Sequence, residues 1–428
     1  MSLRLHIGTS TVGDQPVFLT PDDLRSHVHG IGASQSGKSK LIELIARDLI
    51  TKRKGFCLID PHGYLYRDLL NWLIVMDFER PITLFNPSYE KRIIGFNPFQ
   101  SEYTDDARLM TKAERLMSAT MMAFGDDGTP KPRIKKLLKC LYYVLLETRR
   151  TVPALDCFLD YDRADERNAI IESLTSNIIK AQLREIYGEG KRGFQSYIEG
   201  AGNRLNIFTH PHVRRIIGIT SNSLDLRSII NKQEILLVNL QPAPDDIIGE
   251  ESNRVLGTFL INELWEITRR RETPVEFYLI IDECHRYLTD DIHHILIEAA
   301  KYGLHLFLFH QDMRQLRGDF PGAFKSAQTK LFFSTEERPQ PQRHFALRRA
   351  DHTLIDAETL NVKPFTVSPP EREQYVEQLT SAFLTSAEVD KLLQNTHPQQ
   401  RAQSTIESPR TQIFNNAPEE MSDDDLFE

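Results

Sequence analysis

A glycine-rich segment near the N-terminus has the residue types that hold phosphate groups. Residues 32–39 read Gly-Ala-Ser-Gln-Ser-Gly-Lys-Ser and fit the Walker A pattern G-x-x-x-x-G-K-[ST]. The glycines let the backbone wrap closely, so that successive amide N–H groups and the N-terminus of the following helix face phosphate oxygens. Lys38 would reach the β and γ oxygens of ATP, and the Ser39 hydroxyl would bind Mg²⁺. We predict that ATP is bound by Gly32, Ser34, Gln35, Ser36, Gly37, Lys38, Ser39 and Lys40. The alternative is a glycine-rich turn without a ligand.

Two carboxylates follow an apolar run farther along the chain. Residues 277–281 read Phe-Tyr-Leu-Ile-Ile and precede Asp282 and Glu283, as in a Walker B segment. In an α/β sheet the ligand crevice lies at the carboxyl ends of the strands. Asp282 would hold the Mg²⁺ ion, and Glu283 would orient or deprotonate the water that attacks the γ-phosphate. The alternative is a strand that meets a solvated loop.

Two further strand ends offer polar side chains. Gln311 follows the apolar run 304–309 and is a candidate catalytic residue that senses the γ-phosphate; His310 is the competing choice, and a plain surface loop is the third interpretation. Asp60 follows the apolar run 55–59 and precedes the tight turn Pro61-His62-Gly63. Asp60 is a candidate for a position behind the metal ion, and an ordinary turn residue is an equal alternative.

These residues require a sheet whose strands alternate with helices. Residues 28–99 switch between short apolar runs and helical periodicity, and the alternation returns over residues 222–365. This pattern is typical of a mostly parallel sheet covered by helices, so the predicted fold class is α/β, a RecA-like P-loop NTPase core built from two separated stretches. The predicted strands are 28–31, 55–59, 82–85, 234–240, 277–281, 304–309 and 330–334, and the predicted helices of the core are 38–50, 65–75, 251–270 and 291–302.

The remaining segments have other patterns. Residues 1–27 give short β-like pieces and a capped helical turn, which we interpret as a lead-in. Residues 100–221 show helical periodicity at 105–123, 133–148, 164–185 and 193–207, which predicts an all-α insertion. Residues 366–392 form a C-terminal extension. Residues 393–428 are rich in Gln, Asn, Pro and Ser and end in an acidic run, so we expect a disordered tail.

Composition limits the classes of function. The chain has 428 residues, 40% of them hydrophobic, which is typical of a packed protein of two or three domains. Lys and Arg total 52 against 60 for Asp and Glu, and the net charge of −8 excludes a protein that coats nucleic acid through bulk positive charge. A DNA contact would therefore be local.

Cysteine spacing and hydropathy point to one compartment. The four cysteines lie far apart with no C-x-x-C pair, which excludes a disulfide framework and favours a reducing compartment. No apolar stretch approaches the eighteen or so residues that span a bilayer, and residues 1–10 lack a signal-peptide core. We expect a cytoplasmic protein without direct membrane insertion.

A basic cluster lies in the helical region. Residues 130–150 hold seven Lys or Arg and one Glu, with Tyr142 and Tyr143 between them. Such a cluster could contact phosphates. A solvated helix face is the preferred interpretation.

Several segments beyond the phosphate loop occur in an order that resembles a known family. They are 56–63 (FCLIDPHG), 94–99 (IGFNPF), 203–205 (NRL), 236–240 (LLVNL) and 301–304 (KYGL), the last leading to Gln311. The chain resembles the HerA/FtsK superfamily of RecA-like DNA-pumping ATPases, and within it the TraD/TraG-like coupling proteins of type IV secretion. The resemblance covers roughly 28–365 and implies a hexameric ring, ATP bound between subunits, and DNA moved through a central pore. The helical insertion resembles the all-α domain that coupling proteins use in substrate selection.

Two departures from the family stand out. Relatives commonly place an Arg before the Lys-Tyr-Gly segment, where it reaches the ATP of a neighbouring subunit, but this chain has Ala300. We expect that Lys301, Arg314 or Arg317 replaces it, or that hydrolysis is slow or depends on a partner. The second departure is at the N-terminus, where neither the membrane helices of coupling proteins nor the β-barrel of HerA precedes Leu3. We expect any membrane docking to come through another protein.

The leading functional interpretation is an ATP-hydrolysing, ring-forming DNA translocase. The alternative is an ATP-switched scaffold ATPase that recruits a nuclease, a secretion-channel protein or an anti-phage defence effector without translocation. A small-molecule kinase fits poorly, because Glu283 and Gln311 suit attack by water better than binding of an acceptor.

Overall fold

The computed structural model describes residues 3–125, 131–221, 223–242, 248–289, 291–316 and 320–395. The predicted tail 393–428 overlaps the last helix by three residues and otherwise lies outside the described residues. Arg317, one of the predicted cations, also lies outside them.

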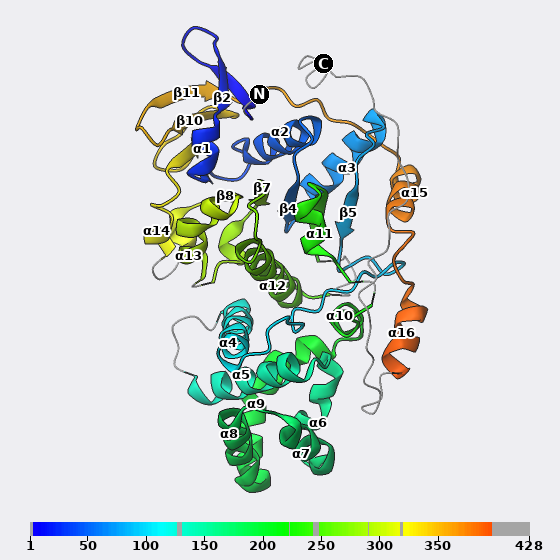
Figure 1. Cartoon of the computed structure of the whole chain (residues 1–428). Helices are drawn as coiled ribbons and strands as arrows, with labels where there is room; N and C mark the ends of the chain where they lie inside the picture. Colours follow the sequence, from blue (N-terminus) through cyan, green and yellow to red (C-terminus); the bar gives the residue numbers. More distant parts are fainter. Residues whose placement is uncertain are drawn as a thin grey trace.

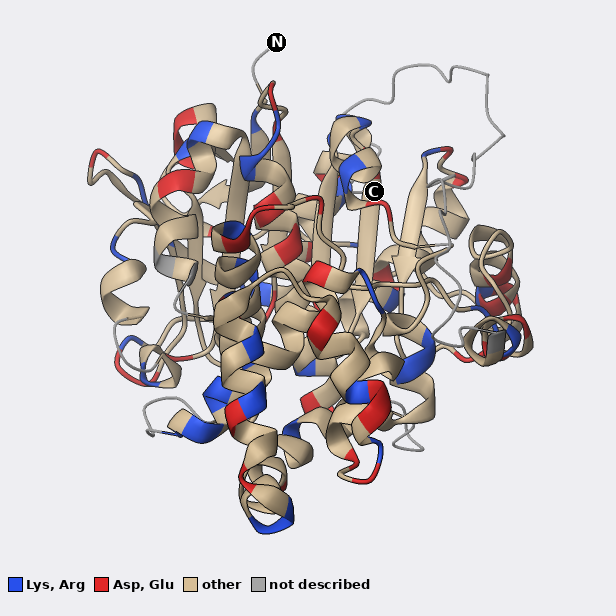
Figure 2. Ribbon diagram, turned by 60° about the horizontal axis from the view of Figure 1, so that its bottom comes forward, with Lys and Arg blue, Asp and Glu red and all other residues tan. Residues whose placement is uncertain are grey.

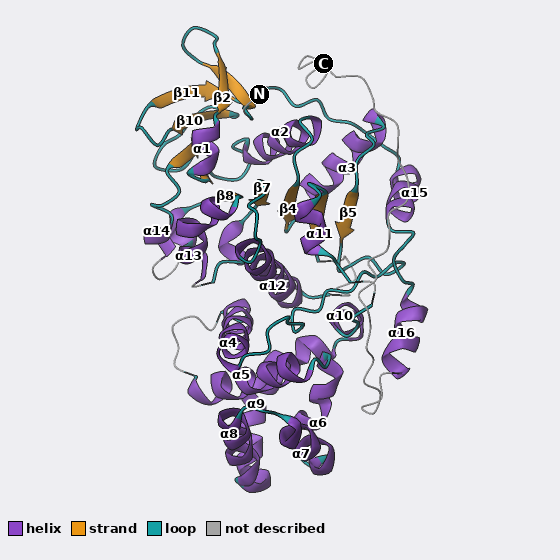
Figure 3. Cartoon of the chain, in the orientation of Figure 1, coloured by secondary structure: helices purple, strands orange, loops and turns teal. Residues whose placement is uncertain are grey.

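One mixed sheet runs through the molecule (Figure 3). The described strands lie in the order β2-β1-β11-β10-β9-β3-β8-β7-β4-β6-β5. From β9 to β5 the pairs are parallel, and from β9 to β2 they are antiparallel. The strands are β1 (Leu5–Ser10), β2 (Pro16–Leu19), β3 (Val28–Ile31), β4 (Phe56–Asp60), β5 (Ile82–Phe85), β6 (Ile235–Asn239), β7 (Phe277–Ile281), β8 (Leu304–His310), β9 (Thr329–Phe333), β10 (His344–Arg348) and β11 (Leu354–Glu358).

The central strands divide their side chains between two hydrophobic cores. Strands β4, β7 and β8 are buried along their whole length, as expected of parallel strands covered on both faces. Leu279 and Ile281 belong to one core, whereas Tyr278 and Ile280 belong to the other, because successive side chains of a strand point to opposite faces. The sheet therefore forms the middle of a three-layer architecture.

Helices cover each face of the sheet (Figure 1). On one face lie α1 (Pro21–Arg25), α2 (Lys38–Thr51) and α3 (Tyr64–Met76). On the other lie α11 (Leu226–Asn231), α12 (Glu250–Arg269), α13 (Asp291–Glu298) and α14 (Phe320–Ala323). The short 3-10 helices of this part are η2 (Cys284–Arg286), η3 (Ala299–Tyr302) and η4 (Met313–Gln315). The predicted helix 291–302 is thus α13 followed by the tighter turn η3.

A group of helices extends from the second face, and α4 packs against α12 (Figure 1). Its members are α4 (Asp106–Ala123), α5 (Pro132–Thr148), η1 (Val152–Leu155), α6 (Asp156–Leu159), α7 (Ala164–Ser173), α8 (Asn177–Gly188), α9 (Gly190–Thr209) and α10 (Pro211–Ile217). The prediction of a single helix over 164–185 is wrong. Leu174 is extended, with φ −66° and ψ 151°, and this separates α7 from α8.

The sheet is built from two stretches of chain, one on either side of the helical group, as predicted, and the first stretch also includes the N-terminal lead-in. Strands β1 and β2 from the N-terminal lead-in join the antiparallel edge, where Thr9 pairs with Glu358. Strands β10 and β11 were not predicted. The side chains of β11 are mostly exposed or half-buried, so its sequence lacks an apolar run.

Two C-terminal helices complete the described chain (Figure 1). They are α15 (Pro369–Leu379) and α16 (Ser386–Asn395). In α16, Asp390 accepts hydrogen bonds at 2.8 Å from both Nε and Nη2 of Arg215 in α10, which fastens the C-terminal segment to the helical group. Within the described residues, no helix combines the length and the hydropathy needed to span a bilayer.

Candidate nucleotide-binding site

The glycine-rich loop connects β3 to α2, as the motif requires. Gly37 precedes α2 with φ 112°, and Gln35 has φ 62°. A Cβ atom at Gly37 would lie 3.0 Å from Cα of Arg343, so both the backbone angle and the packing demand glycine. No side chain caps α2, and its first turn has no acidic residue. The N–H groups of this turn are therefore available to an anion.

Lys38 is buried inside the loop. Its Nζ donates to the carbonyl oxygens of Gly32 and Ala33, at 3.0 Å for Ala33. Burial lowers the pKa of Lys38, and the nearby carboxylates of Asp282 and Glu283 oppose that shift. The structure thus brings the lysine of the first motif close to the two acids of the second, although some 240 residues of chain separate them.

Asp282 lies at the carboxyl end of β7, next to β4. Its amide donates to the carbonyl of Ile59 at 3.1 Å, and its side chain is buried. Burial, and then the carboxylates of Glu283 and Asp60, raise the pKa of Asp282 to about 7. Burial and the neighbouring carboxylates thus disfavour the ionised form of Asp282, and a divalent cation would be favoured here because it stabilises that form.

Asp60 organises the turn that follows β4. Its Oδ1 accepts from the amide of His62 at 2.8 Å, and its Oδ2 accepts from the amide of Tyr66 at 2.9 Å. Both oxygens therefore have main-chain partners. These bonds favour the turn-residue interpretation of Asp60, while the carboxylate stays near enough to raise the pKa of Asp282.

Glu283 has a strained backbone and a half-satisfied carboxylate. Its φ of 46° and ψ of 48° place a non-glycine residue in the left-handed region. Its Oε1 accepts from Nε2 of Gln311 at 2.7 Å. Among the described residues, its Oε2 is buried without a hydrogen-bond partner, and Nδ1 of His285 lies 3.4 Å away. One carboxylate oxygen is thus held while the other remains able to accept a proton.

Gln311 connects the loop to Glu283. In addition to its bond with Glu283, its Oε1 accepts from the Ser34 hydroxyl at 3.4 Å. His310, the competing choice, has a fully buried side chain that bonds His29 instead, at 2.7 Å between the two Nε2 atoms. Of the two candidate side chains, the structure brings that of Gln311 and not that of His310 to Ser34 and Glu283.

The other predicted nucleotide-binding residues differ in exposure. Ser34, Gln35 and Ser39 are exposed, while Ser36 is buried and its Oγ has no hydrogen-bond partner among the described residues. Nζ of Lys40 donates to Glu43 at 2.7 Å and to Asp68 at 3.0 Å. With its side chain so engaged, Lys40 has its main-chain amide left for a phosphate.

Two of the residues predicted to reach the ATP of a neighbouring subunit, which we call the trans cations, have acidic partners within their own chain. Nζ of Lys301 lies 3.5 Å from Glu298 and over the ring of Tyr302. The Arg314 guanidinium bonds Asp312 and lies 3.4 Å from Glu336. Both side chains are more than half exposed, so a neighbouring subunit could compete for them.

Sequence reasoning missed the segment that supports the loop from outside. The amide of Arg343 donates to the Ser36 carbonyl at 3.0 Å, and the amide of Ala33 donates to the Ser334 carbonyl at 2.8 Å. Both partners come from the connection between β9 and β10. No local signal could have found them, because they lie about 300 residues from the loop in sequence.

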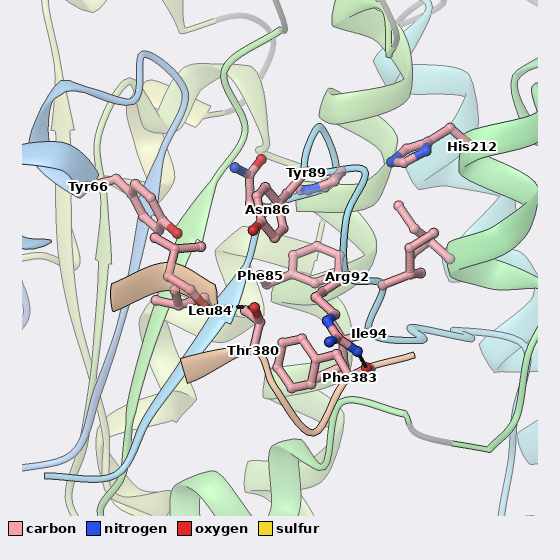
Figure 4. Close-up of a pocket in the computed structure, with 14 residues that line it drawn as sticks. Tyr66, Leu84, Phe85, Asn86, Tyr89, Arg92, Ile94, His212, Thr380 and Phe383 are labelled. Atoms are coloured by element: carbon pink, nitrogen blue, oxygen red, sulfur yellow. Dashed lines mark hydrogen bonds between the residues drawn. The ribbon is translucent and has the colours of Figure 1, made fainter. Parts of the chain in front are cut away.

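One hollow lies apart from this site. The hollow in Figure 4, between β5 and the C-terminal segment, is lined by residues such as Tyr66, Tyr89 and His212 and by none of the predicted site residues.

The charged residues of the surface are mixed in sign. In Figure 2, Lys and Arg are interspersed with Asp and Glu, and in the basic cluster Lys136 bonds Glu185 at 2.8 Å. This pairing favours the solvated-face interpretation of the cluster. In the described ranges, no group of three or more His, Cys, Asp or Glu side chains could hold a metal ion.

Comparisons with known proteins give matches in structure alone. No protein-family model and no curated protein matches the chain. The bacterial conjugative coupling protein TrwB, in an unbound form, matches with a TM-score of 0.57 at 14% identity, over 85% of this chain and 91% of that chain. TrwB in complex with ADP and Mg²⁺ matches with a TM-score of 0.55 at 13% identity, over 86% and 97%.

A second protein matches as well. VirB4 of Thermoanaerobacter pseudethanolicus matches with a TM-score of 0.51 at 13% identity, over 86% of this chain and 97% of that chain. At such identities a structural match defines the fold. The predicted fold class is confirmed, and the resemblance to coupling proteins is confirmed at the level of the fold: this chain has the RecA-like P-loop NTPase fold of TrwB.

Proposed function

We propose that the chain binds ATP and Mg²⁺ at residues 32–39 and hydrolyses the ATP. One observation carries the proposal: Gln311 bonds both Ser34 of the loop and Glu283, while Lys38 lies beside Asp282 and Glu283. A phosphate loop, a pair of strand-end acids and a polar sensor thus converge from β3, β7 and β8. This arrangement suits attack by water on a bound phosphate.

The residues present fit the ligand and the metal. The glycine-rich loop with its uncapped helix provides amide donors for phosphates, and Ser39 and Asp282 would hold Mg²⁺. Bound Mg²⁺ would neutralise charge that develops on the phosphate oxygens. Lys38 would exchange its bonds to the Gly32 and Ala33 carbonyls for bonds to phosphate, and the exposed loop leaves room for that exchange.

Glu283 would act as the general base. Its Oε1 is held by Gln311, so the carboxylate cannot rotate freely, and its Oε2 would orient the attacking water and accept its proton. TrwB has been solved with ADP and Mg²⁺ and with a non-hydrolysable ATP analogue, which supports the choice of ligand.

We further propose that this ATPase is a ring-forming DNA motor. The coupling-protein fold of TrwB supports this assignment, as does the helical group that extends from the sheet. In this proposal residues 28–99 and 222–365 form the ATPase core, residues 100–221 form an insertion that selects substrate, and the protein works in the cytoplasm as a hexamer. The described cysteines are buried free thiols, as a reducing compartment favours.

A scaffold ATPase is the second candidate. It is favoured by Ala300 and by the acidic partners of Lys301 and Arg314, because hydrolysis would be slow without a free cation for the neighbouring site. Such a protein would recruit a nuclease, a secretion-channel protein or a defence effector when ATP binds.

One experiment separates the two candidates. The purified full chain is assayed for ATP hydrolysis with and without DNA, beside Lys38→Ala and Glu283→Gln. A motor should show turnover that rises several-fold with DNA and is lost in both variants. ATP turnover that does not change with DNA but rises with a partner protein would support the scaffold. Wild-type protein that fails to bind ATP would refute both.

A further inference from the structure

The inference concerns two histidines on neighbouring strands, and it rests on the proposed hydrolysis of ATP. His29 lies in β3, three residues before the glycine-rich loop, and His310 ends β8, directly before Gln311. The two strands pair in parallel, with Ile31 opposite His310. The rings stack with their centroids 4.9 Å apart, and neither side chain is exposed to solvent.

The hydrogen bonds assign a tautomer to each ring. Nδ1 of His310 lies 2.9 Å from the carbonyl oxygen of Asp312, and a carbonyl can only accept, so this nitrogen carries the proton. Nε2 of a neutral His310 is then an acceptor. It lies 2.7 Å from Nε2 of His29, which must be the donor.

The other nitrogen of His29 explains why this arrangement is favoured. Its Nδ1 is buried with no hydrogen-bond partner among the described residues. The opposite tautomer of His29 would place a proton on Nδ1, where nothing accepts it, and would leave two lone pairs facing each other. The packing around the pair is also closed, because the Phe324 ring lies 4.4 Å from His29 and 5.7 Å from His310.

The pair is held neutral by its surroundings. Burial lowers the pKa of His29, as do His310 and Lys330. Burial lowers the pKa of His310 to about 4, with help from His285 and Lys38 and against its bond to Asp312. Near neutral pH the rings therefore keep a fixed relay in which His29 donates to His310 and His310 donates to the main chain.

This relay ends beside the residues proposed for hydrolysis. It fixes the carbonyl of Asp312, directly after Gln311, whose side chain holds Glu283 at 2.7 Å. The amides of Gln311 and Asp312 both donate to Oε1 of Gln315 at 3.1 Å, which fixes the two peptide groups that flank Gln311. The carbonyl of His310 accepts from the amide of Gly32 at 3.3 Å, so His310 also contacts the start of the loop.

We propose that His29 and His310 are positioning residues. They hold Gln311 against Glu283, and they fix the end of strand β8, which precedes Gln311, relative to the glycine-rich loop. Neither ring touches the reacting atoms. They act on the reaction by positioning Gln311, because a displaced Gln311 side chain would no longer hold the carboxylate of Glu283, the general base, in place.

The test compares three substitutions in the full chain. His29→Leu removes the donor to His310. His29→Gln restores it, because the Gln amide nitrogen can take the place of the ring Nε2. His305→Leu is the matched control: His305 also lies buried in β8 and bonds a carbonyl, that of Leu24 at 3.2 Å, but near the opposite end of the strand. It should cost stability without affecting hydrolysis.

We expect His29→Leu to lower kcat for ATP at least about tenfold, with KM within about threefold, because placement of the base rather than ground-state binding is lost. His29→Gln should recover most of that rate. Because the pair acts through Gln311, His29→Leu should lower kcat no further in a Gln311→Ala background.

Three outcomes would overturn the inference while the proposed function stands. They are wild-type kcat in His29→Leu, an equal loss of kcat in His305→Leu, and losses that add in the double variant. Should His29→Leu fail to fold, the His29→Gln variant and histidine ¹⁵N spectra of the wild type decide the matter, because the relay requires protonated Nδ1 in His310 and protonated Nε2 in His29. Wild-type protein without ATPase activity would overturn both proposals, and the wild-type assay shows this directly.

Discussion

At the scale of single residues, Glu283 has the features of a functional group rather than a structural one. A left-handed backbone at a residue with a side chain costs about 1 to 2 kcal/mol, and the carboxylate is buried with only one oxygen bonded within the described chain. Such costs persist where the surrounding structure imposes them, and they concentrate at active sites. Glu283 is therefore the residue whose loss should affect hydrolysis most selectively.

The first prediction concerns that residue. Glu283→Gln keeps an oxygen for the bond from Gln311 but cannot accept a proton from water. We expect ATP affinity within about threefold of wild type and hydrolysis lower by about 10² to 10⁴-fold. The measurements are steady-state ATP turnover and binding of a fluorescent ATP analogue. Affinity and turnover that fall together would point to a binding role instead.

The second prediction concerns Gly37. An alanine there would have φ 112° and a Cβ atom 3.0 Å from Cα of Arg343, so the loop would have to shift. We expect Gly37→Ala to weaken ATP binding at least about tenfold. Gly13→Ala is the matched control, since Gly13 also has positive φ, of 82°, but nothing lies within 4 Å of its ideal Cβ. The control should lose stability alone, and equal affinity in the two variants would contradict the prediction.

At the scale of elements, the described strands, helices and connections hold buried or half-buried histidines that must stay neutral. Burial lowers the pKa of six described histidines, to about 3 for His27 and about 4 for His310. The other four are His29, His212, His285 and His305. In the unfolded chain these groups bind protons near pH 6.5, whereas in the folded chain they do not. The contribution of these histidines to stability is therefore fully present above pH 6.5 and is lost as the pH falls below it.

The third prediction follows from this linkage. Each such histidine lowers the free energy of unfolding by about 1.4 kcal/mol per pH unit below 6.5, until the pH reaches its pKa in the folded chain. Three acids act in the opposite sense, because burial raises their pKa values and the folded state binds protons more tightly than the unfolded state. They are Asp282, with its pKa raised to about 7, Asp60 and Glu234. Since the histidines are more numerous, we expect the free energy of unfolding to fall between pH 6.5 and 5. Urea titrations at constant ionic strength measure it, and a level or rising value would refute the prediction.

At the scale of the whole molecule, the site contrasts with the cations that a neighbouring subunit would offer to it. The loop, the acids and Gln311 meet within a single subunit, but the predicted trans cations have acidic partners of their own. In a ring, a neighbour's phosphates could compete with Glu298 for Lys301, or with Asp312 and Glu336 for Arg314. Assembly would then complete the site.

The fourth prediction tests this completion. Subunits with Lys38→Ala cannot bind ATP at their own site. Subunits with Arg314→Ala cannot offer a cation to the ATP of a neighbouring subunit. If Arg314 acts in trans, each variant alone should have turnover below about one-tenth of wild type, and an equal mixture should regain part of it. Lys301→Ala replaces Arg314→Ala in a parallel mixture. Light scattering with ATP reports assembly, and a monomer that hydrolyses ATP at the full rate would rule out a trans cation.

The sequence by itself determined the elements that carry the chemistry. The motif at residues 32–39 requires a strand before it and a helix after it, and the structure has β3 and α2 in those places. The apolar runs at 277–281 and 304–309 are strands because parallel strands buried on both faces need uninterrupted apolar side chains. Local composition is enough to predict such strands, because a strand that is buried on both faces consists of consecutive apolar residues.

Only the tertiary structure decided which residues meet. The side chain of His310 bonds His29, whereas that of Gln311 bonds Glu283, and their adjacency in sequence could not show which one reaches Glu283. Strands β10 and β11 escaped prediction because their burial depends on the pairing with β9 and β1, not on an apolar run. Contacts such as Arg343 with the Ser36 carbonyl join distant parts of the chain, and periodicity within a short window carries no information about them.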